Sequence, residues 1–119
     1  MEPNIKSIRP FVGAKDYDTS REFYTKIGCT ETVISKDMSL FSMGDFAFYL
    51  QDYYVRKWID NTMLFLEVQN LEEYLLFLEE QEITKLKGVK LSKIHKKDWG
   101  QEFFLHDPSG VLWHIGNFE

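Results

Sequence analysis

The chain has 119 residues, of which 44% are hydrophobic, 28% charged and 16% aromatic. This length and balance are typical of one globular domain and exclude a disordered chain, and a net charge of −5 argues against nucleic acid as the main partner. No apolar run approaches the roughly 18 residues that a membrane span needs.

Cysteine usage and the first residues bear on where the protein acts. Cys29 is the only cysteine, so an internal disulfide is impossible and a reducing compartment is the default. The opening stretch MEPNIKSIRPF lacks the apolar segment of a secretory signal. We therefore expect a cytoplasmic protein that has no membrane partner.

The first predicted elements are a strand over residues 7–14 and a helix over residues 18–27. Pro10 lacks the N–H that a central strand would donate, so the strand lies at a sheet edge or begins near Pro10. Asp18 or Thr19 can cap the helix, whose apolar stripe has helical spacing and whose end is followed by a glycine.

Three short strands are predicted after this helix, with the sequences CTETVIS, MSLFSM and FAFYLQ. The turns between them are Lys36-Asp37 and Gly44-Asp45, and a Gly-Asp pair between two apolar runs is a hairpin signal.

The same order of elements begins again at residue 62. A strand over residues 62–68 precedes a helix over residues 71–81, for which Asn70 is the predicted cap. Three more strands are predicted in the segments GVKLSKIH, EFFLHD and VLWHIGNF. The sequence DPSG between the last two has Pro and Gly where a type I turn favours them.

The chain therefore reads as two βαβββ modules, an α+β fold in which the copies match in element order more than in sequence. We expect a single domain over residues 1–119 with module one at about 5–52, a linker at about 53–61 and module two at about 62–118.

Six of the fourteen basic residues lie in residues 85–97, KLKGVKLSKIHKK, which contain no acid. Two interpretations of these lysines stay open. They protect an edge strand from pairing with another sheet, or they form a rim that attracts an anionic ligand.

The arrangement resembles the vicinal-oxygen-chelate superfamily, which includes glyoxalase I, extradiol dioxygenases and bleomycin-resistance proteins, and is most similar to the last of these. The matching residues are Pro10, Asp16, Phe23, Gly28, DNT at 60–62, and WGQEFFLHDPSG followed by His114. The resemblance implies that each module curls into a half-barrel, that two modules enclose a cleft, and that many such proteins form dimers whose sites combine modules of different chains.

The resemblance also allows the metal-ligand positions of the superfamily enzymes to be compared. They fall on Arg9, Tyr49, Met63 and His114. Arginine has no lone pair to give and a thioether is a weak ligand, so only His114 is a plausible donor. No catalytic metal and no other cofactor is therefore expected.

The remaining candidates for chemistry have ordinary structural explanations. His106 and His95 fit surface positions, and Cys29 fits the core. For His114, two roles stay equally open: a buried imidazole whose hydrogen bonds are made within the protein, and a hydrogen-bond donor to a ligand.

The many aromatic residues favour a ligand-binding cleft over a metal site or a nucleophilic site. The resemblance implies that Trp99 stacks on a planar part of the ligand, and Gly100 is expected to leave room beside its indole. Acidic residues such as Asp52, Asp60 and Glu102 are candidates for complementary charge at the mouth. The predicted ligand-binding residues are Arg9, Met38, Tyr49, Met63, Trp99, Glu102, Phe104 and His114.

These observations favour a metal-free homodimer that binds a planar or glycosylated, antibiotic-like molecule. Two alternatives stay open. One is a metal-dependent lyase, isomerase or dioxygenase of the same superfamily, and the other is a protein-interaction module whose cleft is vestigial.

Overall fold

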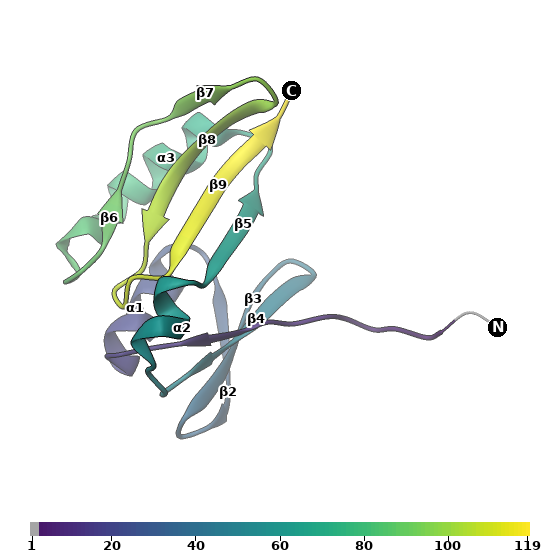
Figure 1. Ribbon diagram of the computed structural model, residues 1–119, viewed down its shortest axis with the longest axis vertical. Coiled ribbons are helices and arrows are strands. Elements are labelled where there is room, and N and C mark those ends of the chain that lie inside the picture. The colour runs from purple at the N-terminus through teal and green to yellow at the C-terminus, as the bar shows by residue number, and fades with distance from the viewer. Residues whose placement is uncertain (1–2) are drawn as a thin grey trace.

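The computed structural model describes residues 3–119, which form two sheets of matching topology, each with a helix against one face (Figure 1). The first sheet has the strand order β1-β4-β3-β2, and β1 pairs parallel to β4 while the other neighbours are antiparallel. Its elements are β1 (Phe11–Gly13), α1 (Tyr17–Lys26), β2 (Thr30–Ser35), β3 (Met38–Met43) and β4 (Phe46–Gln51).

The second sheet repeats this plan. Its order is β5-β9-β8-β6, with β7 also paired to β8, and β5 runs parallel to β9 as β1 does to β4. Its elements are β5 (Met63–Glu67), α3 (Leu71–Glu80), η1 (Ile83–Lys85), β6 (Lys90–Leu91), β7 (His95–Lys97), β8 (Gly100–His106) and β9 (Leu112–Phe118). The prediction of two βαβββ modules in an α+β fold is confirmed.

The helix ends follow simple capping chemistry, with one correction. Asn70 caps α3 as predicted, because its side chain accepts from the backbone N–H of Glu73 at 3.0 Å. The cap of α1 is Asp16, which accepts from the N–H of Thr19 at 3.1 Å, so the choice of Asp18 or Thr19 was wrong. Both later residues lie inside the helix, where a first-turn carboxylate still favours the helix dipole.

Two segments depart from the simplest pattern. The segment that joins the modules contains a short helix, α2 (Arg56–Asp60), which the sequence did not predict. The predicted strand GVKLSKIH divides into β6 and β7, and both lie along the outer side of β8. All six lysines of residues 85–97 are exposed, as expected for a guarded sheet edge.

The two modules share one hydrophobic core, and the hydroxyl group of Tyr24 joins them inside it. Tyr24 of α1 donates to Oδ2 of Asp107 at 2.6 Å and accepts from Nε1 of Trp113 at 3.0 Å, and all three side chains are buried. The placement of Trp113 on the helix-packed face of β9, as its alternation with His114 predicts, is confirmed. The modules therefore meet through a shared apolar core that also contains this polar contact.

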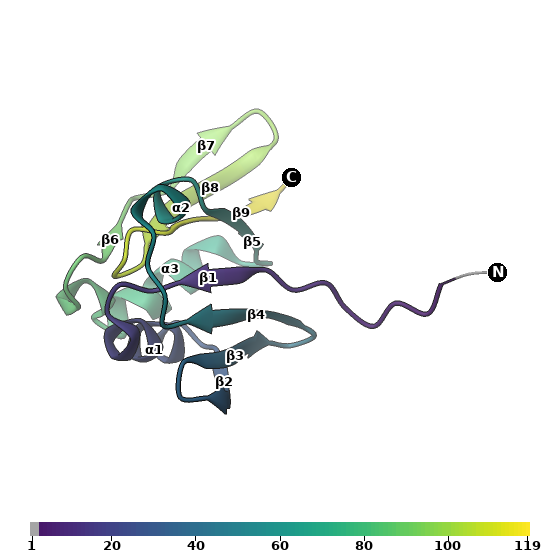
Figure 2. The ribbon, with the colours of Figure 1, turned by 60° about the horizontal axis from the view of Figure 1, so that its bottom comes forward.

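In the described part of the chain, no helix covers the opposite faces of the two sheets (Figure 1). The N-terminal arm, residues 3–10, touches the first sheet through Arg9 and Pro10, and its far end extends away from the body in both views (Figure 2). Ile8 of this arm is 94% exposed. β1 begins at Phe11, directly after Pro10, as the missing proline N–H predicts. No helix within residues 3–119 has the length and hydrophobicity to cross a membrane.

Candidate functional site

The open face of the second sheet collects five of the predicted ligand-binding residues. Strand alternation and register place Met63 on β5, Glu102 and Phe104 on β8, and His114 on β9 on this face, because Phe103, Leu105, Trp113 and Ile115 between them are buried against the helices. Phe104 lies directly across from His114. Trp99, which precedes β8, joins this face through its ring contacts.

Trp99, in the turn between β7 and β8, belongs to an aromatic cluster with one residue from each of β5 and β9. Its ring lies 5.0 Å from that of Phe118 on β9 and 5.9 Å from that of Phe65 on β5, the second contact being edge to face. The Phe65 ring in turn stacks parallel to the imidazole of His114 at 6.5 Å. Phe65 is 45% exposed and Trp99 is half-buried, so part of the aromatic surface faces solvent.

The expectation that Gly100 leaves room for a ligand beside the indole was wrong. Gly100 is buried with φ near +155°, and a Cβ there would overlap the carbonyl oxygen of Asn117 and lie 3.0 Å from Cα of Phe118. The space beside Gly100 is therefore filled by the backbone of β9. Gly116 is the glycine that shapes the aromatic cluster, since a Cβ there would lie 3.0 Å from Cζ of Phe65.

Glu102 and His114 form the polar centre of this face. Nδ1 of His114 lies 3.0 Å from Oε1 of Glu102, which is only 7% exposed. The imidazole is packed edge to face against Phe104, with ring centroids 5.2 Å apart. A buried carboxylate needs such a partner, because an unpaired buried charge costs several kcal/mol, about 3–5 by mutational precedent.

The other three predicted residues lie on the open face of the first sheet. Arg9 donates through Nη1 to the hydroxyl of Tyr49 at 3.0 Å, and the guanidinium lies 5.8 Å from the centroid of that ring. Phe11 stacks on Tyr49 at 5.0 Å, and Met38 shares the face by strand alternation. Within residues 3–119, no hydrogen bond or ring contact joins this group to the Trp99 cluster.

The four positions compared with metal ligands follow the same division. Arg9 and Tyr49 are bonded to each other on the first sheet, whereas Met63 and His114 lie on neighbouring strands of the second. Across residues 3–119, no group of three or more histidine, cysteine, aspartate or glutamate side chains is arranged to hold a metal ion. The absence of a catalytic metal stays a prediction, which metal-binding measurements test.

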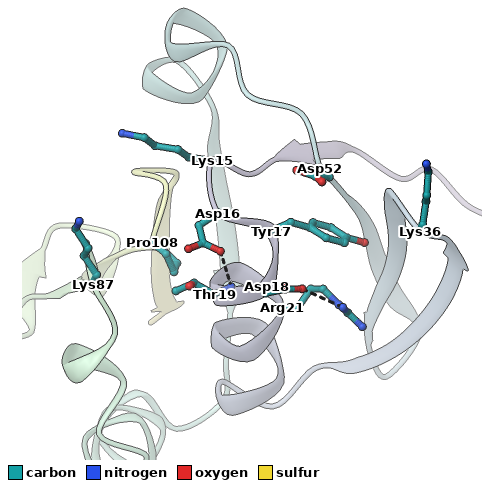
Figure 3. A pocket seen from close by; sticks show the side chains of 11 residues that line it. Lys15, Asp16, Tyr17, Asp18, Thr19, Arg21, Lys36, Asp52, Lys87 and Pro108 are labelled. Atoms are coloured by element: carbon teal, nitrogen blue, oxygen red, sulfur yellow. Dashed lines mark hydrogen bonds and ion pairs between the residues drawn. The ribbon is translucent and has the colours of Figure 1, made fainter.

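Two grooves lie beside the sheets and only partly on their open faces. The larger, about 1030 Å³, lies between the modules and is lined by the arm residues 6–10, by β4 and by parts of β5 and β9. It borders Phe65 and Phe118 of the cluster, and also Leu64, Leu66 and Trp113 of the helix-packed face. The smaller, about 700 Å³, lies at the N-terminus of α1 (Figure 3).

The smaller groove does not offer a ready anion site. Asp16 within it caps α1, and Arg21 bonds to Asp18 and to Glu31 at the back of the first sheet. Its lysines stand apart at the rim (Figure 3). This groove also contains Asp52, and Asp60 pairs with Arg56 on α2. Of the three acids expected at the mouth, only Glu102 therefore lies beside the aromatic cluster.

The buried titratable groups outside this face serve the core. Burial raises the pKa of the Cys29 thiol to about 12, so its placement in the core and not as a nucleophile is supported. Burial also raises the pKa of Asp107, although its carboxylate accepts from the Tyr24 hydroxyl and from the backbone N–H groups of Ser109, Gly110 and Val111. His106 is the exception, because it lies on the open face itself; burial, and then the charge of Lys90, lowers its pKa.

Two residues of the cluster, Phe65 and Phe118, were missing from the predicted set. A period of two places Phe65 on the face of Met63, and it places Phe118 on the face of His114, so strand alternation contained the signal. The pairing of Glu102 with His114 depends on the register between β8 and β9, which strand alternation alone does not specify and the DPSG turn fixes.

Comparison with known proteins gives a consistent picture of the fold. No family model and no curated protein matches the chain. Among solved structures, a bleomycin-binding protein from Streptomyces verticillus, complexed with copper(II)-bleomycin, is 20% identical with a TM-score of 0.75, and 100% of each chain is covered.

Two further structures extend the comparison. An antibiotic-binding protein from a Streptomyces species is 16% identical with a TM-score of 0.78, covering 99% of this chain and 100% of the other. A glyoxylase/bleomycin resistance protein/dioxygenase domain from a Frankia species is 16% identical with a TM-score of 0.71, covering 100% of each. The chain therefore has the fold of the glyoxalase, bleomycin-resistance and dioxygenase proteins, as its resemblance to the vicinal-oxygen-chelate superfamily predicted.

Proposed function

We propose that the protein binds a planar, antibiotic-like small molecule on the open face of its second sheet. The observation that carries the proposal is the half-exposed cluster of Trp99, Phe65 and Phe118 beside the Glu102–His114 pair. Aromatic surface with a few placed polar groups is the usual composition of a site for a flat organic ligand. The bleomycin-binding and antibiotic-binding proteins of the same fold support this ligand class.

Binding of this kind needs no catalytic residue and, in our proposal, no metal. A protein present in excess protects against a toxic molecule by holding it, because occupancy depends only on concentration and affinity. Of the four compared positions, Arg9 already donates to Tyr49, and Met63 offers a weak thioether. Calorimetry with Zn²⁺, Mn²⁺, Ni²⁺ and Fe²⁺ is expected to find no stoichiometric site of micromolar affinity.

We further propose a homodimer in which the open face of the first sheet of one copy covers the open face of the second sheet of the other. Each face by itself exposes large apolar side chains, among them Phe11 and Met63. Monomers rarely leave such patches uncovered. Arg9 and Tyr49 of one copy would then complete the site that contains Trp99 and His114 of the other.

In this proposal the chain is a single domain. Module one covers about residues 5–52, module two about 62–118, and the linker about 53–61. The expected location is the cytoplasm.

The extended arm before Pro10 supports an exchange of arms between the two copies of the dimer. Ile5 is 77% and Ile8 is 94% exposed, although both are apolar.

The proposal is tested by titrating a panel of planar antibiotics, bleomycin included, against the purified protein and two tryptophan variants. Trp99→Ala should weaken binding several-fold or more, because a ring stack contributes on the order of 1 kcal/mol beyond burial. Trp58→Ala is the matched control, since Trp58 is a 63% exposed ring on α2 that lies outside the cluster. Equal binding by both variants, or no binding by any panel member, would contradict the proposal.

A further inference from the structure

We propose that His114 accepts a hydrogen bond from the ligand through Nε2, and that Glu102 is the positioning residue that fixes the required tautomer. The ligand class that follows is a planar molecule with an O–H or N–H donor at the edge of its ring. This inference rests on the proposed function, because it concerns the same face of the second sheet.

The two side chains differ in their access to the open face. Glu102 is 7% exposed, lying between His95 and Gly116 in the strand register. The side chain of His114 is 27% exposed, against 9% for that of Glu102. A ligand on this face therefore meets the imidazole, while the carboxylate lies behind it.

The chemistry of the pair decides which ring nitrogen is free. An ionised carboxylate only accepts hydrogen bonds, so Nδ1 of His114, at 3.0 Å from Oε1, must carry the proton. In a neutral imidazole one nitrogen donates and the other accepts, which leaves a lone pair on Nε2. Carboxylates fix histidine tautomers in this way behind many metal and catalytic sites.

The surrounding rings hold this acceptor in place and make it selective. Phe65 stacks parallel to the imidazole and Phe104 packs edge to face against it. A ligand that covers Nε2 without offering a donor removes the water bound there and leaves this acceptor without a hydrogen bond, which weakens binding. A site with a buried hydrogen-bonding group discriminates strongly against analogues that lack its complement.

The tautomer is testable without any ligand. Long-range proton–nitrogen NMR correlation at mildly alkaline pH should show His114 with its proton on Nδ1. In Glu102→Gln, whose amide can donate as well as accept, the tautomer should no longer be fixed. Glu67→Gln is the matched control, because Glu67 is an exposed acid in the same row of the sheet, across Gly116 from Glu102. A proton on Nε2 in the unaltered protein would overturn the inference.

Binding is tested with naphthol and its methyl ether, which share a ring system and differ in one donor. Calorimetry should find naphthol bound roughly tenfold more tightly by the unaltered protein, the upper range for one net hydrogen bond. His114→Phe keeps an aromatic ring and should abolish the preference while it retains binding of the ether. The double variant His114→Phe/Glu102→Gln avoids an unpartnered buried carboxylate and should behave in the same way.

The outcomes separate the two levels of the proposal. Equal affinity for both probes, with both weakened by Trp99→Ala, would overturn the role of His114 and leave the binding face intact. A naphthol preference that survives in His114→Phe would also overturn it. Absence of binding by either probe would count against the binding face itself and against the inference with it.

Discussion

The hydroxyl of Tyr24 donates to Oδ2 of Asp107 at 2.6 Å, and this bond joins a helix of the first module to the DPSG turn of the second. The same oxygen accepts from the indole of Trp113. Because all three groups are buried, one oxygen atom satisfies two partners that water does not reach.

Tyr24→Phe should therefore lower the free energy of unfolding by about 2–4 kcal/mol, since two buried polar groups lose their partner. Tyr74→Phe is the control, because its hydroxyl donates at 2.8 Å to a single backbone carbonyl, that of Ile27. It should cost about 1 kcal/mol. Urea unfolding measures both, and an equal cost for the two variants would contradict the bridging role of Tyr24.

Gly100→Ala should destabilise the protein more than Gly44→Ala. Both glycines have positive φ, so each substitution costs about 1 kcal/mol in backbone strain. At Gly100 the new methyl group also meets the backbone of Asn117, whereas nothing lies within 4 Å of the equivalent position at Gly44. Thermal unfolding should show the larger loss at Gly100. A smaller loss there would mean that β9 moves aside easily.

The thiol of Cys29 should be unreactive in the folded protein. Its pKa of about 12 leaves little thiolate at neutral pH, and the side chain is buried. The raised pKa also makes the free energy of unfolding depend on pH. The folded state holds the thiol protonated, so stability is fully present below the unfolded pKa and falls as pH rises from there towards 12. Alkylation that is fast without denaturant would contradict this placement.

The homodimer should appear in light scattering as twice the monomer mass of 14.2 kDa at micromolar concentration. Removing residues 3–9 should weaken the dimer if the arm crosses to the other copy, while the monomer fold survives because these residues are exposed. A monomer mass for the full chain would contradict the proposed pairing of open faces.

The regular elements were predictable because their signals are local. Pro10 marked the start of β1, Asn70 marked α3, and Gly44-Asp45 marked the β3–β4 hairpin. The repeated order of elements predicted the two modules, which the strand order of the two sheets confirms, and structural comparison confirms the fold that the resemblance implied. Strand alternation also placed His114 and Trp113 on opposite faces.

What the sequence left undetermined depends on how neighbouring strands pair and on local backbone geometry. The pairing of Glu102 with His114 needs the register of β8 on β9, and the backbone around Gly100 fills a space that the sequence suggested was open. The cap of α1 was missed because Asp16, Asp18 and Thr19 all have capping side chains and differ only in backbone geometry.

Substitution of Trp99 and of Trp113 should lower the stability of the protein by different amounts. Trp113→Ala should cost about 3–5 kcal/mol, because it leaves a cavity in the core and removes a partner of Tyr24. Trp99→Ala should cost less, since its ring is half-buried at the rim of the second sheet. Chemical unfolding compares the two, and a larger loss at Trp99 would assign that ring to structure.

The most direct test of the central claim is an NMR titration with the planar antibiotic panel that follows the indole N–H signals of Trp58, Trp99 and Trp113. We predict that a bound ligand shifts the Trp99 signal together with the backbone amides of Glu102 and His114, and that the Trp58 signal stays in place. A ligand that binds while the Trp99 signal remains unchanged would contradict the placement of the site on this face.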